Sequence, residues 1–243
     1  MDIQGKTALV TGAAKRVGRE IALALAQKGA HIVLHYKGSR ADAEATGAEI
    51  RALGVSCFLV SADLSNAAQI TQMLSDVFQK ISSIDILVNS ASLFYETPLK
   101  NVQESDWDSL LDTNLKGPFL LSRSIGLKMF EGRGGKIVNI ADWSGFRPYK
   151  NYAPYCTSKG GLITLTKALA RDLAPKVMVN AVAPGPVLVP PDMPEAEKEA
   201  IAKTTALGRW GQPRDVANAV SFLVENDFMN GTVLVVDGGR SIV

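Results

Sequence analysis

The sequence predicts an α/β fold with one doubly wound sheet of seven parallel strands, and three observations support this prediction. Seven short apolar runs alternate along the chain with longer segments of helical periodicity. Most of these runs are continuous in Val, Ile and Leu, which is typical of parallel strands covered on both faces. The 243 residues include no internal repeat and no low-complexity linker, so we expect one domain over residues 1–243.

The expected strands leave room for a helix between each pair. They are Thr7–Val10, Ala30–His35, Val55–Val60, Ile84–Asn89, Lys136–Ile140, Val177–Val182 and Gly231–Val236. Amphipathic stretches between them include Gly18–Lys28, Ala41–Leu53, Ala67–Ile81 and Ser158–Leu173. Right-handed crossovers would then place helices on both faces of the sheet.

Composition and charge give no support to a nucleic-acid-binding or membrane protein. The net charge is +2, and the basic residues are spread along the chain without a cluster. No apolar run reaches the length of a membrane span, and the first residues show no signal pattern. Cys57 and Cys156 stand far apart, and free thiols in a reducing cytosol are the simplest interpretation. We therefore expect a cytoplasmic protein without a metal site.

One proline-rich segment interrupts the alternation of strands and helices. Residues 183–194 carry five prolines, and the acidic, helix-prone stretch Glu195–Lys203 follows. The segment comes after the carboxyl end of a strand, at the edge where ligands bind in α/β sheets. We expect a substrate lid over about residues 184–210, with an irregular surface loop as the alternative.

The first strand runs directly into a turn suited to binding phosphate. Residues 11–18 read Thr-Gly-Ala-Ala-Lys-Arg-Val-Gly, and a helix follows. Gly12 lets the backbone turn tightly, and the amides of Arg16, Val17 and Gly18 would open the helix toward a pyrophosphate. Arg16 stands where a middle glycine is expected. Its side chain would project toward the cofactor phosphates or the substrate pocket, unless it is simply solvated.

The end of the second strand favours NADPH over NADH. The segment 34–40 reads Leu-His-Tyr-Lys-Gly-Ser-Arg and lacks the acid that would bind the ribose of NAD. Lys37, Ser39 and Arg40 instead offer donors and positive charge to a 2′-phosphate. Ser39 has an alternative role as the cap of the next helix.

Three side chains carry the candidate chemistry. Tyr155 and Lys159 are four residues apart and would share one face of a helix, where the ammonium would lower the pKa of the phenol. Asp142 stands thirteen residues before Tyr155, at the end of a strand. Tyr155 would then be a proton donor with a carboxyl group beside it.

With these motifs the chain resembles the short-chain dehydrogenase/reductase family over its whole length. The matching pieces are Thr11-Gly12 with Gly18, Asp63-Leu64, Asn89-Ser90-Ala91, Asn114, Tyr155 with Lys159, Pro184-Gly185 and Asp237-Gly238-Gly239. The resemblance implies a Rossmann-type fold and a homotetramer assembled through residues 101–130 and 152–173.

The resemblance also implies roles for individual residues. Tyr155 would be the general acid, Lys159 would bind the nicotinamide ribose, and Asn114 would position a water of the proton relay. The adenosine half of the cofactor would be lined by Asp63, Leu64, Asn89 and Ala91. Pro184 and Gly185 would complete the cofactor site.

Asp142 departs from the family pattern, which has serine at this position. A carboxylate would repel the negative oxygen that develops in carbonyl reduction, whereas it suits the N–H groups of a nitrogen ring. The alternative for Asp142 is a turn residue that binds backbone N–H groups. Trp143 beside it would wall the pocket or pack against a neighbour.

Further features resemble the pteridine reductase branch of the family. They are Arg16, the pair His35-Tyr36, and the segment 89–99, which reads Asn-Ser-Ala-Ser-Leu-Phe-Tyr-Glu-Thr-Pro-Leu. By this resemblance Ser92 would bond the cofactor phosphate or the pterin, and Phe94 would stack on the pterin unless it is a core aromatic. Val189 would lie in the substrate loop. Ser90, where that branch has a second asparagine, leaves the hydrogen bonding there open.

These features together predict an NADPH-dependent reductase of a pterin or folate, acting at a C=N carbon. Which pterin or folate, and in which oxidation state, stays open. One alternative is a carbonyl reductase, for instance of 3-oxoacyl thioesters. The other is a regulator that binds NADPH without turnover, which the complete set of Asn114, Tyr155 and Lys159 argues against.

Overall fold

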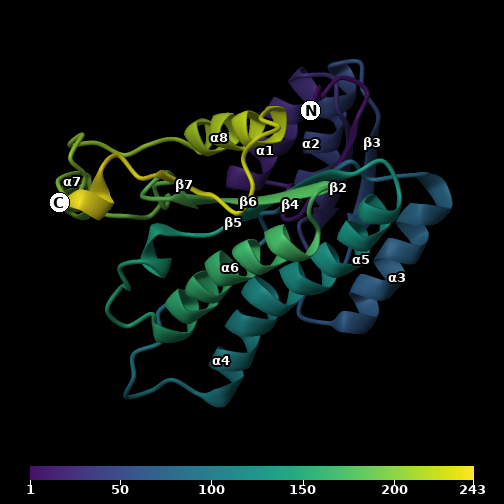
Figure 1. The fold of residues 1–243 in the computed structure, drawn as a ribbon. Helices are drawn as coiled ribbons and strands as arrows, with labels where there is room; N and C mark the ends of the chain where they lie inside the picture. Colours follow the sequence, from purple (N-terminus) through teal and green to yellow (C-terminus); the bar gives the residue numbers. More distant parts are fainter.

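The computed structural model describes residues 1–243 and contains one seven-stranded sheet (Figure 1). Every neighbouring pair of strands is parallel, in the order β3-β2-β1-β4-β5-β6-β7. The strands are β1 (Thr7–Val10), β2 (His31–Tyr36), β3 (Cys57–Ser61), β4 (Ile86–Asn89), β5 (Gly135–Ile140), β6 (Val177–Pro184) and β7 (Val233–Val236). The predicted fold class is confirmed.

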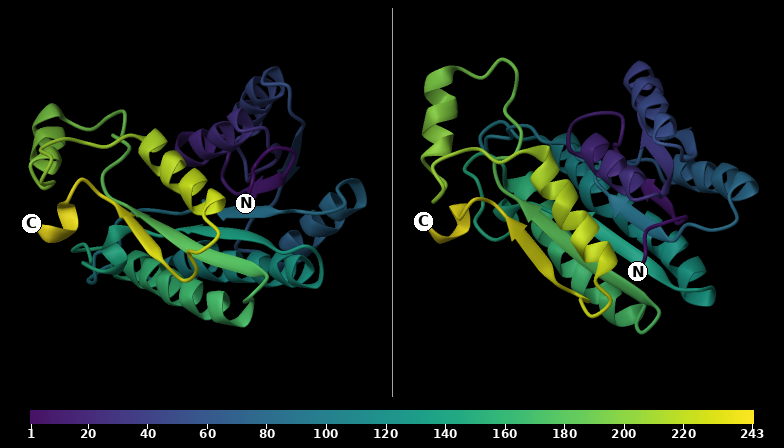
Figure 2. Two further views of the ribbon diagram at one scale, coloured as in Figure 1. Left: turned by 45° about the horizontal axis from the view of Figure 1, so that its top comes forward. Right: turned by 90° about the horizontal axis from the view of Figure 1, so that it is seen from above.

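Helices cover both faces of the sheet and bury a separate apolar layer on each. One layer lies between the strands and α1 (Arg16–Gln27), α2 (Arg40–Ala52) and α8 (Pro213–Glu225). The opposite layer lies under α3 (Ala67–Lys80), α5 (Gly117–Glu131) and α6 (Ala153–Asp172). In Figure 2 the two helical layers are seen on either side of the strands. This is why the strands are apolar in continuous runs and do not alternate.

The strand order places a topological switch beside β1. The chain builds outward from β1 to β2 and β3, then crosses back and continues from β4 to β7 on the other side. Loops that leave the carboxyl ends of β1 and β4 therefore diverge, and this divergence opens a crevice in doubly wound sheets. The loops after β1 to β6 all start at this edge and carry many of the candidate site residues, while Asn114, Tyr155 and Lys159 lie on the helical elements that follow.

Two helices differ from what periodicity indicated. The helix expected from Ser158 begins at Ala153, because Pro154 occupies the first turn, where its missing N–H breaks no bond. The chain after α4 (Glu104–Leu111) passes through a π-helical turn, Asp112–Lys116, into α5. The extra residue of that turn disrupts the 3.6-residue period that sequence reading relies on.

The proline-rich segment ends in a short helix, α7 (Glu195–Ala202), that buries none of its residues. It stands off the edge of the sheet near the C-terminal end (Figure 2). Backbone bonds from Leu207 to Gly238 and from Gly211 to Pro186 attach the return segment to the body. Across the chain, no helix combines the length and the apolar character that crossing a bilayer would require.

Candidate active site

Asp142, Tyr155 and Lys159 meet at the carboxyl end of β5. The hydroxyl of Tyr155 donates to Oδ2 of Asp142 at 3.0 Å. Lys159 Nζ lies 5.7 Å from the centre of the Tyr155 ring and donates to the carbonyl oxygen of Ile140 at 2.9 Å. Tyr155 and Lys159 are buried, whereas Asp142 is partly exposed. The predicted constellation therefore forms, and one edge of it is open.

Local structure explains how Asp142 reaches Tyr155. Asp142 is the N-cap of a single 3-10 turn, Trp143–Gly145, and its Oδ1 accepts the backbone N–H of Ser144 at 2.8 Å. A carboxylate that caps in this way is held in one orientation. Asp142 thus binds a backbone N–H group, as in the turn-residue alternative predicted from the sequence. Its other oxygen, Oδ2, accepts the Tyr155 hydroxyl at the same time.

Burial and mutual charge govern how the three groups ionise. Burial raises the pKa of Asp142, although bonds from Ser144 and the charge of Lys159 oppose it. Burial likewise lowers the pKa of Lys159 to about 8. Burial and the adjacent Asp142 raise the pKa of Tyr155 well above its usual value. A lowered pKa of Tyr155, as expected from the neighbouring Lys159, is therefore not found in the cofactor-free protein, because burial and then the adjacent Asp142 raise it. Tyr155 stays protonated as a hydrogen-bond donor.

Asn114 is buried in the π-helical turn and ties two parts of the site together. Its Oδ1 accepts from the Leu93 amide at 2.8 Å and from the Ser92 hydroxyl at 3.2 Å. Its Nδ2 donates to Leu93 O at 2.9 Å and to Ser158 Oγ at 3.2 Å. The side chain is thus committed to protein partners and fixes the loop after β4 against α6. The water-positioning role implied for Asn114 stays a prediction. Because the side chain is already bonded, the backbone of Asn114 would have to bind that water.

The phosphate turn is held from below by His35. The Gly12 amide donates to Nδ1 of His35 at 3.2 Å, and Nε2 of His35 meets the carbonyl oxygen of Ala62 at 3.0 Å. This pair of contacts requires the neutral imidazole with its proton on Nε2. Burial lowers the pKa of His35 to about 4, which keeps it neutral. His35 therefore supports the turn, and does not face a ligand itself.

Arg16 adopts a left-handed backbone conformation, with φ of 59°. Its side chain is exposed and forms no hydrogen bond or ion pair within the chain. The amides that open α1 have no side-chain cap, and the first turn carries no acid. An exposed arginine beside uncapped amides leaves both available to an anion. Val17 and Gly18 lie in the same turn.

The residues expected near the adenosine phosphate lie together after β2 and β3. Lys37 pairs with Asp63 at 2.6 Å, and Arg40 pairs with Glu44 at 2.8 Å. Ser39 occupies the N-cap position of α2, but its side chain caps no amide. Its hydroxyl is thus free, while both cations hold carboxylates through exposed bonds that an incoming phosphate can replace. Tyr36 is half-buried and Leu64 is buried beside them.

The loop after β4 is fastened to the phosphate turn by Thr11, which belongs to the first motif but had no role assigned from the sequence. The Thr11 hydroxyl accepts the amides of Ser90 and Ala91 at 2.9 and 3.0 Å. A Cβ on Gly12 would lie 2.9 Å from the Ala91 backbone, so the two loops touch. Asn89 points into the core, where its Nδ2 donates to Ser122 and Asn139 and its buried Oδ1 has no hydrogen-bond partner.

An aromatic cluster forms one wall beside Asp142. Phe94 is exposed, so the core alternative is wrong. Its ring stacks on Tyr152 at 4.7 Å and meets Tyr155 edge-on at 4.8 Å. Trp143 is buried, donates to the Tyr149 hydroxyl, and lies 4.6 Å under the guanidinium of Arg240. Sequence reading missed Tyr149, Tyr152 and Arg240, because they come from loops and the C-terminal segment and share no motif.

The segment predicted as a substrate lid follows β6 and is mostly exposed. Val189 is exposed in the loop after β6, whereas Pro184 is buried at the strand's end. A Cβ on Gly185 would meet Asp237 at 2.7 Å, so Gly185 is needed for close packing. Trp210 donates to the carbonyl of Lys198 at 2.9 Å and closes the base of α7.

The arrangement fits a phosphate-bearing dinucleotide along the crevice. Lys37, Ser39 and Arg40 supply charge and donors at one end, after β2, and the uncapped amides that open α1 lie in the middle, after β1. Tyr155 and Lys159 lie at the other end of the crevice, where a reactive ring would be bound. No group of three or more His, Cys, Asp or Glu residues is placed to hold a metal ion.

Comparison with known proteins agrees with this geometry. The family model described as "Enoyl-(Acyl carrier protein) reductase" matches residues 12–241. The 3-oxoacyl-[acyl-carrier-protein] reductase FabG of Staphylococcus aureus is 38% identical over 241 residues, covering 96% of this chain and 97% of its own. A subunit of (2S)-[(R)-hydroxy(phenyl)methyl]succinyl-CoA dehydrogenase from Thauera aromatica is 36% identical and covers 100% of this chain and 99% of its own.

A solved structure extends the comparison. The blue fluorescent protein from a metagenomic library, in complex with NADPH, superposes with a TM-score of 0.92 at 30% identity, covering 99% of each chain. The matching family, together with relatives above 30% identity over nearly the full chain, shows shared descent. The names of the two relatives point to thioester substrates, and none of the three names a pterin. They favour the carbonyl-reductase alternative over the pteridine interpretation.

Proposed function

The chain belongs to the short-chain dehydrogenase/reductase family, and from this premise we propose that it is an NADPH-dependent reductase of a flat nitrogen heterocycle of the pterin or folate type. A hydride would add to the carbon of a C=N bond and a proton to its nitrogen. The observation that carries the proposal is the bond from the Tyr155 hydroxyl to Oδ2 of Asp142 at 3.0 Å.

That bond bears on substrate class because the Tyr155 proton already faces a carboxyl group. In carbonyl reduction this proton must reach the substrate oxygen, and an ionised Asp142 would repel the charge that develops there. A nitrogen heterocycle offers N–H donors to the same carboxylate while its ring nitrogen accepts from Tyr155. Asp142 then binds the substrate and does not oppose the reaction.

NADPH supplies the hydride when it is bound, and the chain's own residues handle the proton. Tyr155 donates its proton to the substrate nitrogen. Asp142 binds the substrate as a carboxylate, and because burial raises its pKa it can take up a proton and return it to Tyr155 after the transfer. The positive charge of Lys159 favours the phenolate at the moment of transfer.

The aromatic cluster supports a flat substrate. Phe94 is exposed beside Tyr155, and one of its faces already stacks on Tyr152. The exposed part of the Phe94 ring is available to a planar ring, and stacked aromatic pairs of this kind contribute about 0.5–1.5 kcal/mol beyond burial. An extended acyl chain would gain less from such a wall.

A 3-oxoacyl thioester is the second candidate, and the names of the relatives favour it. Its chemistry becomes compatible with Asp142 if the carboxyl group is protonated, since burial raises its pKa. A neutral carboxyl group can donate to a carbonyl oxygen as serine does. The Tyr155 hydroxyl would then leave Asp142 for the substrate.

Measuring NADPH oxidation with four substrates decides between these candidates. Dihydrobiopterin, dihydrofolate, dihydromonapterin and an acetoacetyl thioester are compared at equal concentration. We expect turnover with at least one pterin or folate and little with the thioester. Turnover of the thioester alone would contradict the proposal and support the second candidate. NADPH binding without turnover of any of the four would support the regulator.

An Asp142→Ser variant sharpens the same experiment. Serine removes the charge and restores a neutral donor, so pterin turnover should fall by about 10²–10⁴-fold while thioester turnover rises. If the native enzyme is already a good thioester reductase, the substitution should change thioester turnover only modestly. NADPH affinity, measured by fluorescence titration, is the control and should stay the same.

A further inference from the structure

The hydroxyl of Ser144 is buried beside the catalytic carboxyl group without a hydrogen-bond partner. Ser144 is 0% exposed, and its Oγ is one of three buried side-chain polar atoms in the chain that lack a partner. Buried hydroxyls almost always have a hydrogen-bond partner, because burial removes their bonds to water and an unpartnered hydroxyl leaves that free-energy cost uncompensated. The two other unpartnered atoms are Oδ1 of Asn89, which faces the core beside Ser122 and Asn139, and Oγ of Ser221 on α8, and neither is bonded to Asp142.

The backbone already brings Ser144 to Asp142. The Ser144 amide donates to Oδ1 of Asp142 at 2.8 Å, and Tyr155 donates to Oδ2. The Ser144 hydroxyl is shielded from bulk water, and the neighbouring Gly145 packs on the backbone of α6. A Cβ on Gly145 would lie 3.2 Å from the Gly160 nitrogen. Oδ1 of Asp142, which already accepts the Ser144 amide, is therefore also within reach of the Ser144 hydroxyl. Rotation about the Cα–Cβ bond of Ser144 brings the two together.

We propose that Ser144 is a positioning residue whose hydroxyl donates to Oδ1 of Asp142 and sets how readily this carboxyl group takes and releases the proton it shares with Tyr155. The sharing of that proton rests on the proposed function. The hydrogen bond itself does not, because it involves only groups of the chain.

The charges and polar groups around Asp142 explain why a hydrogen bond from the Ser144 hydroxyl would affect its ionisation. Burial raises the pKa of Asp142, and the side chain and the amide of Ser144 oppose that rise. From α6, Tyr155, Cys156 and Lys159 face this region. Tyr149 approaches from the preceding loop, and Arg240 from the C-terminal segment. None of these others reaches Oδ1 with a hydrogen bond. Ser144 is thus the residue placed to act on that oxygen.

Loss of the hydroxyl should make Asp142 hold its proton to higher pH. A donor favours the charged carboxylate, so Ser144→Ala should raise the pKa of Asp142 by about one pH unit. The matched control is Ser221→Ala, which removes another buried, unpartnered hydroxyl, from α8. It should leave Asp142 unchanged.

Titration of the cofactor-free protein tests this without any substrate. The carboxyl carbon of Asp142 is followed by NMR in protein labelled at aspartate, with Asp142→Asn to assign the signal. An upward shift in Ser144→Ala, absent in Ser221→Ala, supports the proposal. An unchanged titration in Ser144→Ala overturns it. Because no substrate is involved, this result is independent of whether a pterin or a thioester is the substrate.

The rate profile then tests the link to proton transfer. If Asp142 supplies the proton, kcat falls as pH rises through its pKa, so the basic limb of the profile should move upward in Ser144→Ala. A merely structural loss would lower kcat at every pH without moving the limb. If the NMR titration of Asp142 shifts but the basic limb of the rate profile does not, the hydrogen bond from Ser144 is supported and the sharing of a proton between Asp142 and Tyr155 is refuted.

Discussion

At the scale of single residues, the arrangement of Asp142 and Tyr155 makes a direct prediction about catalysis. Tyr155→Phe and Asp142→Asn remove the proton donor and its carboxyl partner with little change in shape. Each should lower kcat by about 10²–10⁴-fold, and the NADPH dissociation constant should stay within a few-fold of the native value. Steady-state rates and fluorescence titration measure the two quantities. Retained turnover in both variants would rule out the proposed role of the pair.

His35 predicts a loss of stability in acid. Burial lowers its pKa from 6.5 to about 4 in the folded protein, so between these values the unfolded chain binds more protons than the folded one. Stability therefore falls as pH drops from 6.5 to 4, by about 3 kcal/mol in total. Urea unfolding at a series of pH values measures this slope.

The control for that experiment is the chain's other histidine. A His35→Gln variant should lose the slope assigned to His35, whereas His31→Gln, at a partly exposed position, should keep it. Because His35 accepts the Gly12 amide, its replacement should also weaken NADPH binding. An identical acid slope in the native protein and in His35→Gln would contradict the assignment.

At the scale of elements, the phosphate turn needs a glycine at position 12, both for its backbone conformation and for the close approach of the loop after β4. Gly12 has φ of 64°, and a Cβ there would lie 2.9 Å from the backbone of Ala91. Gly12→Ala should lower the unfolding free energy by about 1–2 kcal/mol for the backbone conformation. Displacement of the loop after β4 should add at least about 1 kcal/mol and weaken NADPH binding.

Gly5 offers a matched control for that substitution. Its φ is 69°, and no atom lies within 4 Å of the position that an alanine methyl group would occupy there. Gly5→Ala therefore isolates the backbone contribution and should leave NADPH binding unchanged. Urea unfolding and cofactor titration of both variants separate the two effects. Equal losses in both would show that contact with Ala91 does not matter.

Sequence patterns predicted the elements better than their ends, for physical reasons. The strands were recognisable because burial on both faces makes them continuous apolar runs. The π-helical turn at Asp112–Lys116 was not, since one extra residue shifts the apolar period. Among site residues, Tyr155, Lys159 and Asp142 follow fixed spacings. Tyr149 and Arg240 are far apart in the sequence and meet only in the folded chain, so no local sequence pattern predicts their contact.

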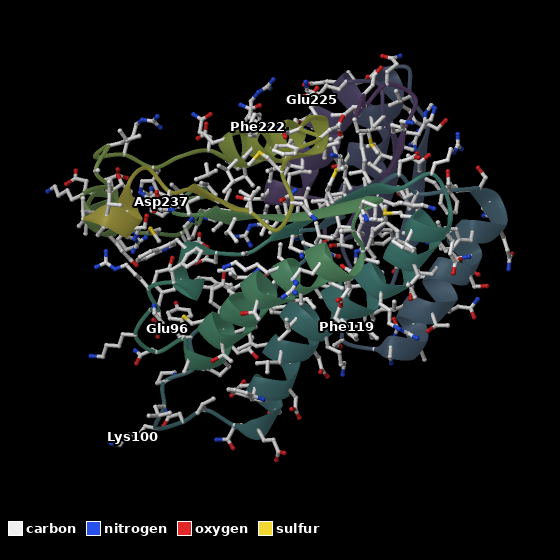
Figure 3. The ribbon with its side chains drawn as sticks, viewed as in Figure 1. Glu96, Lys100, Phe119, Phe222, Glu225 and Asp237 are labelled. Atoms are coloured by element: carbon white, nitrogen blue, oxygen red, sulfur yellow. The ribbon has the colours of Figure 1, made fainter.

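At the scale of the whole molecule, apolar side chains on the outer helices predict an assembly. Trp107 on α4 and Phe119 and Leu127 on α5 are 40–45% exposed, within the segment 101–130 that the family resemblance assigns to tetramer contacts. Phe119 lies on the outer side of α5 in Figure 3. Exposed apolar groups gathered on neighbouring helices are typical of contact surfaces.

Phe119→Glu tests this expectation. A buried, unpaired carboxylate at a contact would oppose association, so the particle mass measured by light scattering should fall below that of the native protein. Leu53→Glu, at an apolar position that is 43% exposed at the end of α2, is the control and should leave the mass unchanged. A native mass for Phe119→Glu would show that α5 is not part of the interface.

Trp143 gives the molecule an internal optical probe. Its indole lies directly after Asp142, bonded to Tyr149 and under Arg240. The two other tryptophans lie on α4 and at the base of α7. Emission from Trp143 should respond to a change in charge or contact at the carboxyl group, while Trp210 should respond to movement of α7. Rapid-mixing experiments can thus time ligand arrival separately from any movement of the predicted lid, without attaching a dye.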